Sequence, residues 1–258
     1  MSDRHVKLDR LRAILRDLGS VLVAYSAGVD STFLLKMAVD TLGRERVLAV
    51  TGVSPSLADR ELDDARKLAD QIGAEHLVIG TDELEDENYA SNPVNRCYFC
   101  KSELFGKLTA LARERGYAAV VDGSNADDLG DYRPGMQAGH ERGVRSPLQE
   151  AGLTKEEIRA FSQELGLPTW DKPAAPCLSS RIPYGQRVTI EKLRQIGDAE
   201  ALLHQLGFRE VRVRHHEQIA RIEVPRRDMT RLIESEVADL VVNRLKEIGF
   251  RYVTLDLK

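Results

Sequence analysis

The spacing of apolar residues along the first 170 positions switches repeatedly between the helical and the extended period. Helical spacing predicts helices over residues 8–18, 34–43, 62–72, 101–115 and 154–165. The last of these opens with Thr154 and Glu157, which form the pattern of a capping box. Short apolar runs predict buried strands over residues 21–25, 47–53, 77–79 and 118–121. Strands that alternate with helices predict the α/β class, with a parallel sheet that has helices on both faces.

The pattern changes after a stretch from Pro168 to Gln186 that is rich in Pro, Ser and Gly and has little periodicity. We expect an N-terminal domain over residues 1–170, a cysteine-bearing active-site loop over 171–186 and a C-terminal domain over 187–258. The last domain is expected to contain strands at 188–190, 211–214, 219–224 and 252–257 and helices at 190–206 and 228–248. This β-α-β-β-α-β order predicts a small α+β module of the ferredoxin-like type.

Composition and charge narrow the possible functions. With 42% hydrophobic and 30% charged residues, the 258-residue chain has the balance of a globular protein. Its formal net charge of −4 argues against a broad nucleic-acid-binding surface. No apolar run approaches the roughly 20 residues of a membrane span, and the beginning of the chain lacks the apolar core of a signal peptide. We therefore expect a cytoplasmic protein with neither a membrane nor a nucleic-acid partner.

A candidate phosphate loop lies between the first expected strand and the next helix. It consists of Ser26, Ala27, Gly28, Val29, Asp30 and Ser31. Backbone N–H groups at such a helix start bind phosphate, and small residues such as Ala27 and Gly28 allow a close approach. Ser26 and Ser31 can donate hydroxyls to phosphate oxygens, and Asp30 can hold Mg²⁺. A plain strand-to-helix turn with Ser31 as a cap is the alternative.

A second polar segment follows the expected strand at 118–121. It contains four candidate nucleotide-binding residues: Gly123, Asp128, Asp131 and Arg133. In an open α/β sheet, ligands bind at the carboxyl ends of the strands, so this segment can orient a metal, ATP or the acceptor. Gly52, at the end of another expected strand, is a further candidate for close approach to adenine. A solvated acidic loop is the alternative for the polar segment.

The only three cysteines are Cys97, Cys100 and Cys177, which is an odd number and indicates no disulfide framework. Cys97 and Cys100 form a C-x-x-C pair at the start of an expected helix. A redox dithiol normally accompanies a thioredoxin-like βαβ pattern, which is missing here, and a structural zinc needs four ligands. A [4Fe–4S] cluster held by three thiolates leaves one iron open to sulfide or substrate. Buried, inert thiols are the remaining alternative.

The phosphate-loop run resembles the S-G-G-x-D-S loop of the PP-loop ATP pyrophosphatases, with Ala27 in place of one glycine. This resemblance implies the adenine nucleotide alpha hydrolase-like fold and the cleavage of ATP to AMP and pyrophosphate. The segments C-Y-F-C-K at 97–101, D-Y-R-P-G at 131–135, C-L-S-S-R-I-P-Y-G at 177–185 and R-Y-V-T-L-D-L at 251–257 resemble LarE-type ATP-dependent sulfur transferases. Those enzymes thiolate the two carboxylates of pyridinium-3,5-biscarboxylic acid mononucleotide, whose product becomes the nickel-pincer nucleotide of lactate racemase.

The LarE-type resemblance also implies roles for individual residues. It assigns catalysis to Asp30, Cys177 and Arg181, substrate binding to Lys101, Ser180, Arg212 and Arg214, and metal binding to Glu200, Glu223 and the three cysteines. Arg212 and Arg214 alternate along an expected strand, so both guanidinium groups lie on one face and suit a phosphate. An ordinary exposed strand face, and solvated carboxylates at Glu200 and Glu223, are the alternatives. His215 and His216 are expected at the surface.

These features predict an ATP-dependent sulfur transferase that adenylates an acceptor carboxylate and then replaces AMP with sulfur, using ATP, Mg²⁺ and a [4Fe–4S] cluster. Sulfide or another sulfur donor is the expected co-substrate, and a homo-oligomer is expected. Some LarE-type proteins without the upstream C-x-x-C give up the sulfur of one cysteine, and Cys177 is the residue that this alternative consumes. Two rival functions stay open: tRNA thiolation by a PP-loop enzyme, and a non-catalytic nucleotide-binding sulfur-carrier partner.

Overall fold

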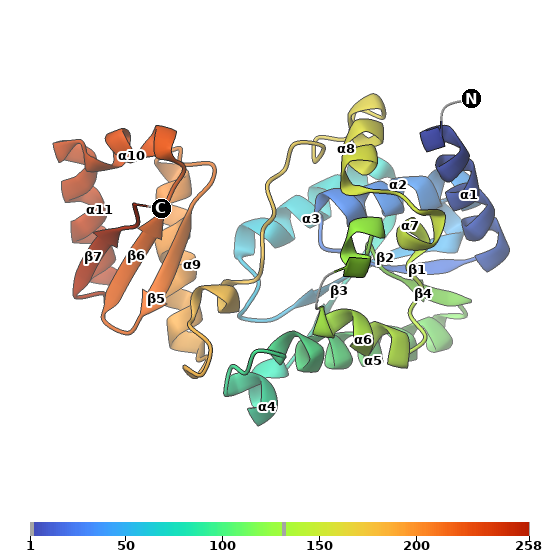
Figure 1. The fold of residues 1–258 in the computed structure, drawn as a ribbon. Coiled ribbons are helices and arrows are strands. Elements are labelled where there is room, and N and C mark those ends of the chain that lie inside the picture. The colour runs from blue at the N-terminus through green and yellow to red at the C-terminus, as the bar shows by residue number, and fades with distance from the viewer. Residues whose placement is uncertain (1–2, 131–132, 258) are drawn as a thin grey trace. The chain divides into compact units, whose positions relative to one another are not determined.

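The computed structural model describes residues 3–130 and 133–257. The chain forms two compact units (Figure 1). The first contains Met1–Asp86 and Asn95–Ala175, and the second contains Glu87–Val94 and Pro176–Lys258. A short segment from the first half of the sequence therefore belongs to the second unit. A linear division of the chain at residues 170 and 186 does not foresee this inserted segment.

The sheet of the first unit has four parallel strands in the order β3-β2-β1-β4. Their bounds are β1 Val21–Ala24, β2 Val47–Val53, β3 Glu75–Gly80 and β4 Ala119–Val121. In the register, Val21 lies opposite Val47 on one side and Ala119 on the other. Because the strands are parallel, their carboxyl ends share one edge, and the loops that follow β1 and β4 begin there as neighbours. The predicted α/β sheet is confirmed.

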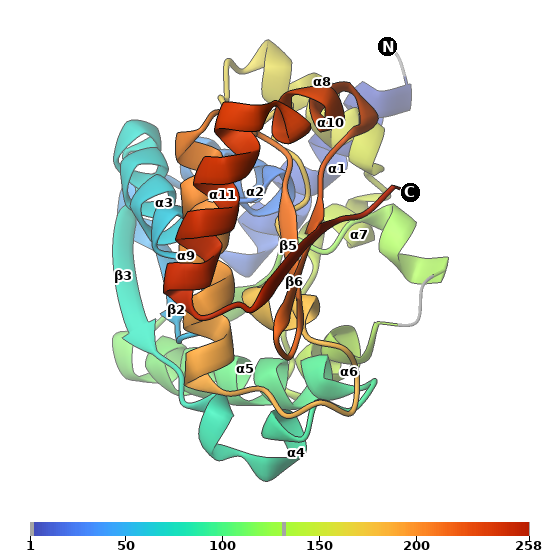
Figure 2. The same cartoon turned by 90° about the vertical axis from the view of Figure 1, so that its left-hand side faces the viewer.

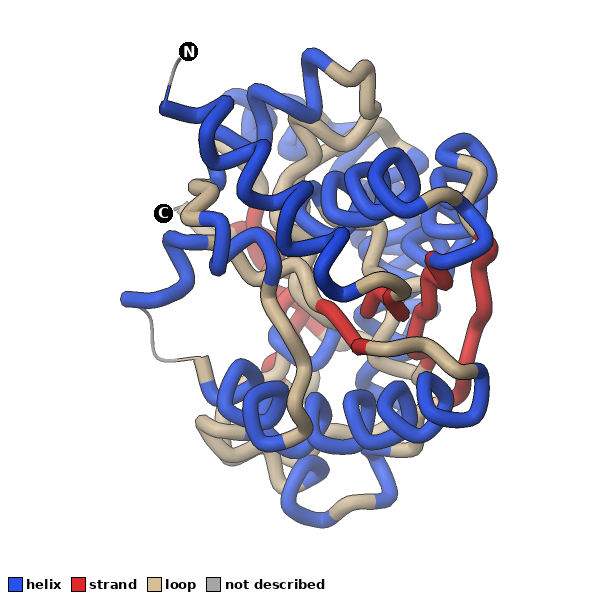
Figure 3. The backbone as a smooth tube through the Cα atoms, turned by 90° about the vertical axis from the view of Figure 1, so that its right-hand side faces the viewer, coloured by secondary structure: helices blue, strands red, loops and turns tan. Residues whose placement is uncertain are grey.

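Helices cover both faces of this sheet (Figure 3). They are α1 Asp3–Leu18, α2 Val29–Leu42, α3 Asp59–Ile72, α5 Arg96–Arg115, α6 Pro134–Glu141, α7 Pro147–Ala151 and α8 Lys155–Glu164. Val21 and Val23 of β1 point into a core shared with α1, α2 and α8, whereas Leu22 packs against Phe105 and Leu108 of α5. The capping box predicted at the start of α8 is present. Among the described residues, no helix combines the length and the apolarity needed to cross a membrane.

The second unit contains a three-stranded sheet in the order β5-β6-β7. The strands are β5 Arg212–His216, β6 Ile219–Glu223 and β7 Tyr252–Leu255, with β6 antiparallel to β5 and parallel to β7. The helices are α4 Glu87–Ala90, α9 Ile190–Gln205, α10 Arg226–Ile233 and α11 Ser235–Ile248. α9 and α11 lie side by side over one face of the sheet (Figure 2). The predicted small C-terminal α+β domain is confirmed.

Two details of this unit differ from the sequence prediction. Val188 and Thr189 form no strand, because Thr189 is the N-cap of α9 and its hydroxyl accepts a hydrogen bond from the Lys192 N–H at 3.2 Å. The sheet therefore lacks the first strand of the ferredoxin-like order. The single helix expected over 228–248 is broken at Glu234, whose non-helical backbone (φ −56°, ψ 133°) separates α10 from α11.

His215 is also placed differently, inside the second unit rather than at its surface. It shares the inner face of β5 with Val213 and is 2% exposed. Its Nε2 atom lies 2.9 Å from Oε1 of Gln195. Burial lowers the pKa of His215, so the ring is neutral at pH 7. The period-two pattern of β5 therefore includes a histidine among its core positions.

Candidate functional site

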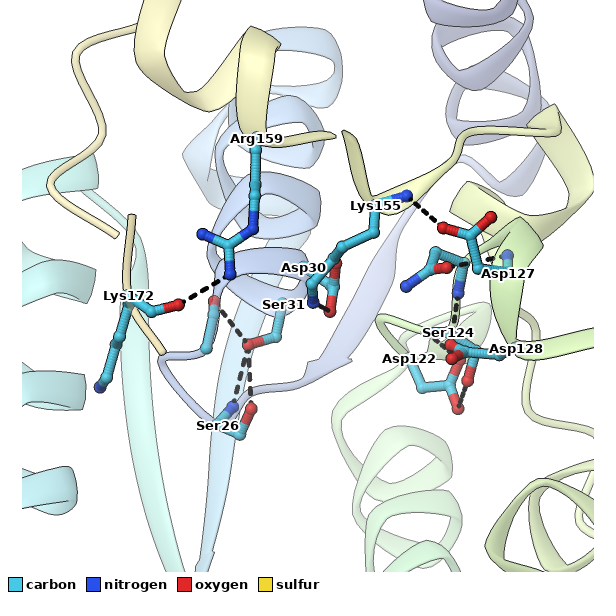
Figure 4. Close-up of polar contacts among 12 residues, drawn as sticks. Ser26, Asp30, Ser31, Asp122, Ser124, Asp127, Asp128, Lys155, Arg159 and Lys172 are labelled. Atoms are coloured by element: carbon cyan, nitrogen blue, oxygen red, sulfur yellow. Dashed lines mark hydrogen bonds and ion pairs between the residues drawn. The ribbon is translucent and has the colours of Figure 1, made fainter. Parts of the chain in front are cut away.

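A tight loop joins β1 to α2 and contains the phosphate-binding candidates (Figure 4). Its two serines face each other: Ser31 Oγ accepts a hydrogen bond from the Ser26 N–H at 3.3 Å and lies 3.1 Å from Ser26 Oγ. Ala27 is buried and has a φ of 55°, in the left-handed region that favours glycine. Gly28 is the N-cap of α2, and Val29 begins the helix. Two hydroxyls and the first N–H groups of α2 are therefore close together.

Asp30 lies in the first turn of α2, beside this loop. One of its carboxylate oxygens binds the ammonium group of Lys155, the first residue of α8 (Figure 4). The other oxygen, Oδ1, is buried and has no hydrogen-bond partner among the described residues. A buried carboxylate oxygen without a hydrogen-bond partner is suited to bind Mg²⁺. The sequence alone gives no sign of Lys155, because only the tertiary fold brings α8 to α2.

The second polar loop lies directly against the phosphate loop. A Cβ atom added to Gly123 would meet the backbone of Ser31, 3.0 Å from its nitrogen and 3.2 Å from its Cα. Asp128 is buried, accepts a hydrogen bond from the Asn125 N–H at 2.9 Å and pairs with Arg133 at 2.8 Å. These two candidates therefore contact each other and shape the loop. Asp131 lies outside the described residues.

Gly52 and a buried glutamate lie near the ends of β2 and β3. A Cβ atom at Gly52 would meet the Leu104 Cδ1 atom of α5 at 2.7 Å, so this glycine packs closely against α5. Glu83 is 2% exposed and accepts hydrogen bonds from Ser54 Oγ at 2.5 Å and Ser56 Oγ at 2.8 Å. This cluster was not among the sequence candidates. It joins the loops after the two strands.

The C-x-x-C pair occupies the start of α5, where Cys97 is exposed and Cys100 is half-buried. Residues three apart lie on the same side of a helix, so both thiols leave α5 in similar directions. α6 packs across this turn: a Cβ atom at Gly135 would lie 2.9 Å from Cγ of Lys101, and Tyr98 Oη donates to Glu141 at 2.6 Å. α6 therefore connects the second polar loop to the cysteine turn.

In the second unit, Cys177 is exposed and precedes a short 3₁₀ turn, Leu178–Arg181. The guanidinium group of Arg181 is buried and fully engaged. Its Nε and Nη2 atoms donate to Glu200 at 2.8 and 3.0 Å, and its Nη1 donates to the carbonyls of Pro176 and Cys177 at 2.5 and 3.2 Å. Glu200 also accepts from the Val213 N–H at 2.9 Å. Arg181 therefore ties the backbone at Cys177 to α9 and β5.

The inserted segment Glu87–Val94 also forms hydrogen bonds with the turn at 178–181 and the loop that follows it. The hydroxyl of buried Tyr89 lies 2.6 Å from Ser179 Oγ. Asn92 donates through Nδ2 to the carbonyls of Pro183 and Gln186 at 2.8 and 3.0 Å. The segment that ends three residues before Cys97 is thus hydrogen-bonded to the loop that follows Cys177.

Arg212 and Arg214 lie on the same side of β5, opposite the face that packs on the helices. Arg214 is bound to Glu223 at 2.8 and 3.0 Å and donates to the Ser180 carbonyl at 2.8 Å. Burial alone would raise the pKa of Glu223, but hydrogen bonds and charge from Arg214 and Arg221 outweigh burial and lower it. Arg212 makes no ion pair with any described carboxylate. Of the two arginines on this side of β5, Arg212 is therefore the one whose charge no described carboxylate neutralises.

The two glutamates expected to bind a metal, Glu200 and Glu223, form ion pairs with arginines. Glu200 holds Arg181, and Glu223 holds Arg214. Over residues 3–130 and 133–257, no three His, Cys, Asp or Glu side chains form a group that could hold a metal ion. Cys97 and Cys100 belong to the first unit and Cys177 to the second. As donors, however, three exposed or half-exposed thiols suit iron, because thiolates are the usual ligands of iron–sulfur clusters.

The sequence is similar to proteins of several functions. A family model described as NAD synthase matches residues 8–116. The pyridinium-3,5-bisthiocarboxylic acid mononucleotide synthase of Lactiplantibacillus plantarum is 45% identical over 263 residues, which cover 100% of this chain and 92% of that protein. The uncharacterized protein slr1717 of Synechocystis is 51% identical over 252 residues, 98% of this chain and 94% of that one. A tRNA-specific 2-thiouridylase of Parvibaculum lavamentivorans is 30% identical over 212 residues, 67% of this chain and 52% of that enzyme.

The contact between the two loops can be tested with Gly123→Ala. The added methyl meets backbone atoms of α2, which cannot rotate away, so we expect a loss of about 1–3 kcal/mol in the free energy of unfolding and weaker ATP binding. Gly80→Ala, at the end of β3, is the control because nothing lies within 4 Å of its added Cβ. Denaturant unfolding and ATP titration check both variants. Equal stability and equal ATP affinity of the two variants would contradict the close contact between Gly123 and Ser31.

Proposed function

The chain belongs to the family of LarE-type ATP-dependent sulfur transferases, and on this premise we propose that it converts the carboxylates of pyridinium-3,5-biscarboxylic acid mononucleotide into thiocarboxylates. The observation that carries the proposal is the phosphate loop, where two serine hydroxyls, the first N–H groups of α2 and the Asp30 carboxylate gather. In this proposal the protein acts in the cytoplasm as a homo-oligomer and takes sulfur from sulfide or another donor. Its product is a precursor of the nickel-pincer nucleotide of lactate racemase.

The first step activates the acceptor carboxylate. One carboxylate oxygen attacks the α-phosphorus of ATP, the bond from that phosphorus to the oxygen bridging the β-phosphate breaks, and pyrophosphate leaves. The hydroxyls of Ser26 and Ser31 and the N–H groups of α2 hold the leaving pyrophosphate. Asp30 would hold Mg²⁺ through Oδ1, which has no hydrogen-bond partner within the described part of the chain; the ion neutralises phosphate charge when bound. Activation is needed because carboxylate oxygen is a poor leaving group, whereas AMP leaves readily.

We assign the acceptor phosphate to Arg212, with Arg214 beside it. Arg212 brings a positive charge that no described carboxylate neutralises, and a guanidinium group suits phosphate oxygens. Glu223 and the Ser180 carbonyl fix the orientation of Arg214. Lys101 and Ser180 are further substrate contacts in this proposal. The Lys101 ammonium lies 5.3 Å from the centre of the Phe105 ring.

The second step replaces AMP with sulfur. A sulfur nucleophile attacks the acyl carbon of the adenylate, the bond from that carbon to the oxygen of AMP breaks, and AMP leaves with the carboxylate oxygen. We assign Cys97, Cys100 and Cys177 as ligands of a [4Fe–4S] cluster, which when bound offers an open iron site to sulfide. Arg181 holds the Cys177 backbone in place and acts as a positioning residue. Its pairing with Glu200 supports this role better than a direct catalytic role.

The role of Asp30 is tested with Asp30→Asn, which keeps the shape of the side chain and removes its charge. We expect acceptor-dependent release of pyrophosphate to fall about a hundredfold or more, because the charge that holds the metal at the reacting phosphates is lost. Asp40→Asn on the same helix is the control, since Asp40 forms a surface ion pair with Lys36. Pyrophosphate release at the wild-type rate in Asp30→Asn would show that other residues hold the metal.

The acceptor site is tested with Arg212→Ala. Loss of charge-assisted hydrogen bonds should weaken acceptor binding about tenfold to a hundredfold while ATP affinity stays constant. Arg194→Ala, on the exposed surface of α9, is the control. Calorimetric titration with each ligand measures both affinities. A parallel fall in ATP and acceptor affinity would assign Arg212 to the nucleotide site or to the fold.

The cysteines are tested with Cys97→Ala, purified without oxygen. If the three thiols act as one cluster site, this variant loses bound iron and repeated turnover together. Ser102→Ala, on the same helix, is the matched control and should keep both. If Cys177 instead gives up its own sulfur, Cys97→Ala still completes one turnover. Cys177 then becomes dehydroalanine, visible as a mass loss of about 34 Da.

A further inference from the structure

Lys172, which neither the sequence candidates nor the proposed reaction includes, lies against the phosphate loop. Its ammonium group donates to the Ala27 carbonyl at 3.3 Å, to Glu61 at 2.8 Å and to Asp64 at 3.4 Å. The side chain is 18% exposed. The backbone around it is held as well: Arg159 of α8 donates to the carbonyl of Lys172 at 2.9 Å (Figure 4). Lys172 is therefore a fixed cation.

The contact with the Ala27 carbonyl has a consequence for the next residue. A trans peptide is planar, and its C=O and N–H groups point in opposite directions. Holding the Ala27 carbonyl therefore sets the direction of the Gly28 N–H, which belongs to the N-cap of α2. Ala27 also occupies the left-handed region, which residues other than glycine adopt at an energetic cost. A contact that fixes this peptide compensates for the missing glycine.

The charges around Lys172 indicate which role it has. All three donors of its ammonium group are used, one on the loop and two on carboxylates of α3. Its charge is neutralised by Glu61 and Asp64, so Lys172 is suited to hold protein atoms rather than to attract a phosphate. Lys155, by comparison, pairs with one described carboxylate, Asp30, and is 39% exposed.

We propose that Lys172 is a positioning residue for nucleotide binding: it fixes the Ala27–Gly28 peptide so that the Gly28 N–H faces the phosphates of ATP. The inference rests on the proposed function, because it requires ATP to bind at this loop. It means that nucleotide binding also depends on a residue outside the phosphate loop. The loop is correctly shaped only when the segment after α8, which carries Lys172, is in place.

The test compares Lys172→Met with Lys172→Arg and with a control, Lys67→Met, which removes an exposed cation from α3. In nucleotide-free protein labelled with ¹⁵N-glycine, we expect the Gly28 amide resonance, identified with Gly28→Ala, to shift in Lys172→Met alone. ATP affinity should fall about tenfold to a hundredfold in that variant. Lys172→Arg should recover much of it, because a guanidinium group can still donate to the carbonyl.

The other outcomes are distinct. Weaker ATP binding with an unmoved Gly28 resonance would make Lys172 a direct phosphate ligand and overturn its positioning role. Unchanged ATP affinity in Lys172→Met would refute the inference while leaving the proposed function intact. Failure of the wild-type protein to bind ATP would instead refute the proposed function. If Lys172→Met does not fold, Glu61→Gln replaces it, because loss of the 2.8 Å partner should shift the same resonance.

Discussion

The close approach of Gly123 to the first turn of α2 is the contact on which the nucleotide half of the site depends. No side chain separates the two segments, so the loop after β4 lies against the backbone of Ser31. That loop continues into α6, which packs on the turn of α5 that contains Cys97. Parallel strand order makes this possible, because β1 and β4 are neighbours and end at the same edge. One glycine thus connects the shape of the phosphate loop to the placement of the first two thiols.

In the second unit, the exposed Cys177 lies beside an irregular turn whose backbone is held in place by hydrogen bonds. The buried pair of Arg181 and Glu200 is expensive to desolvate, and removing one partner of such a pair costs about 3–5 kcal/mol. Here the guanidinium group also binds two carbonyls beside Cys177. Hydrogen bonds from the inserted segment through Tyr89 and Asn92 add support that does not involve the thiol. The Cys177 thiol is therefore exposed while its backbone is fixed.

Local sequence patterns were sufficient for the parallel sheet, the turn from β1 into α2 and the capped start of α8, because each depends on periodicity or on residues a few positions apart. They were insufficient where two local signals compete or where a distant contact decides. The run at Val188 and Thr189 favours a strand by propensity, but the cap at Thr189 prevails. The pairing of Glu200 and Glu223 with arginines 19 and 9 residues away is likewise not visible in the sequence pattern. Lys155 and Lys172 have no local signal at all, since their partners are 125 and 145 positions away.

The central claim is that one carboxylate oxygen of the acceptor attacks the α-phosphorus of ATP and later leaves with AMP. Acceptor labelled with ¹⁸O in its carboxylates tests this claim most directly. With ATP and a sulfur donor, each thiocarboxylate formed should be matched by one ¹⁸O in the phosphate of AMP, and pyrophosphate should contain none. Thiocarboxylate formed alongside unlabelled AMP, or alongside ADP, would contradict adenylation of the carboxylate by this enzyme.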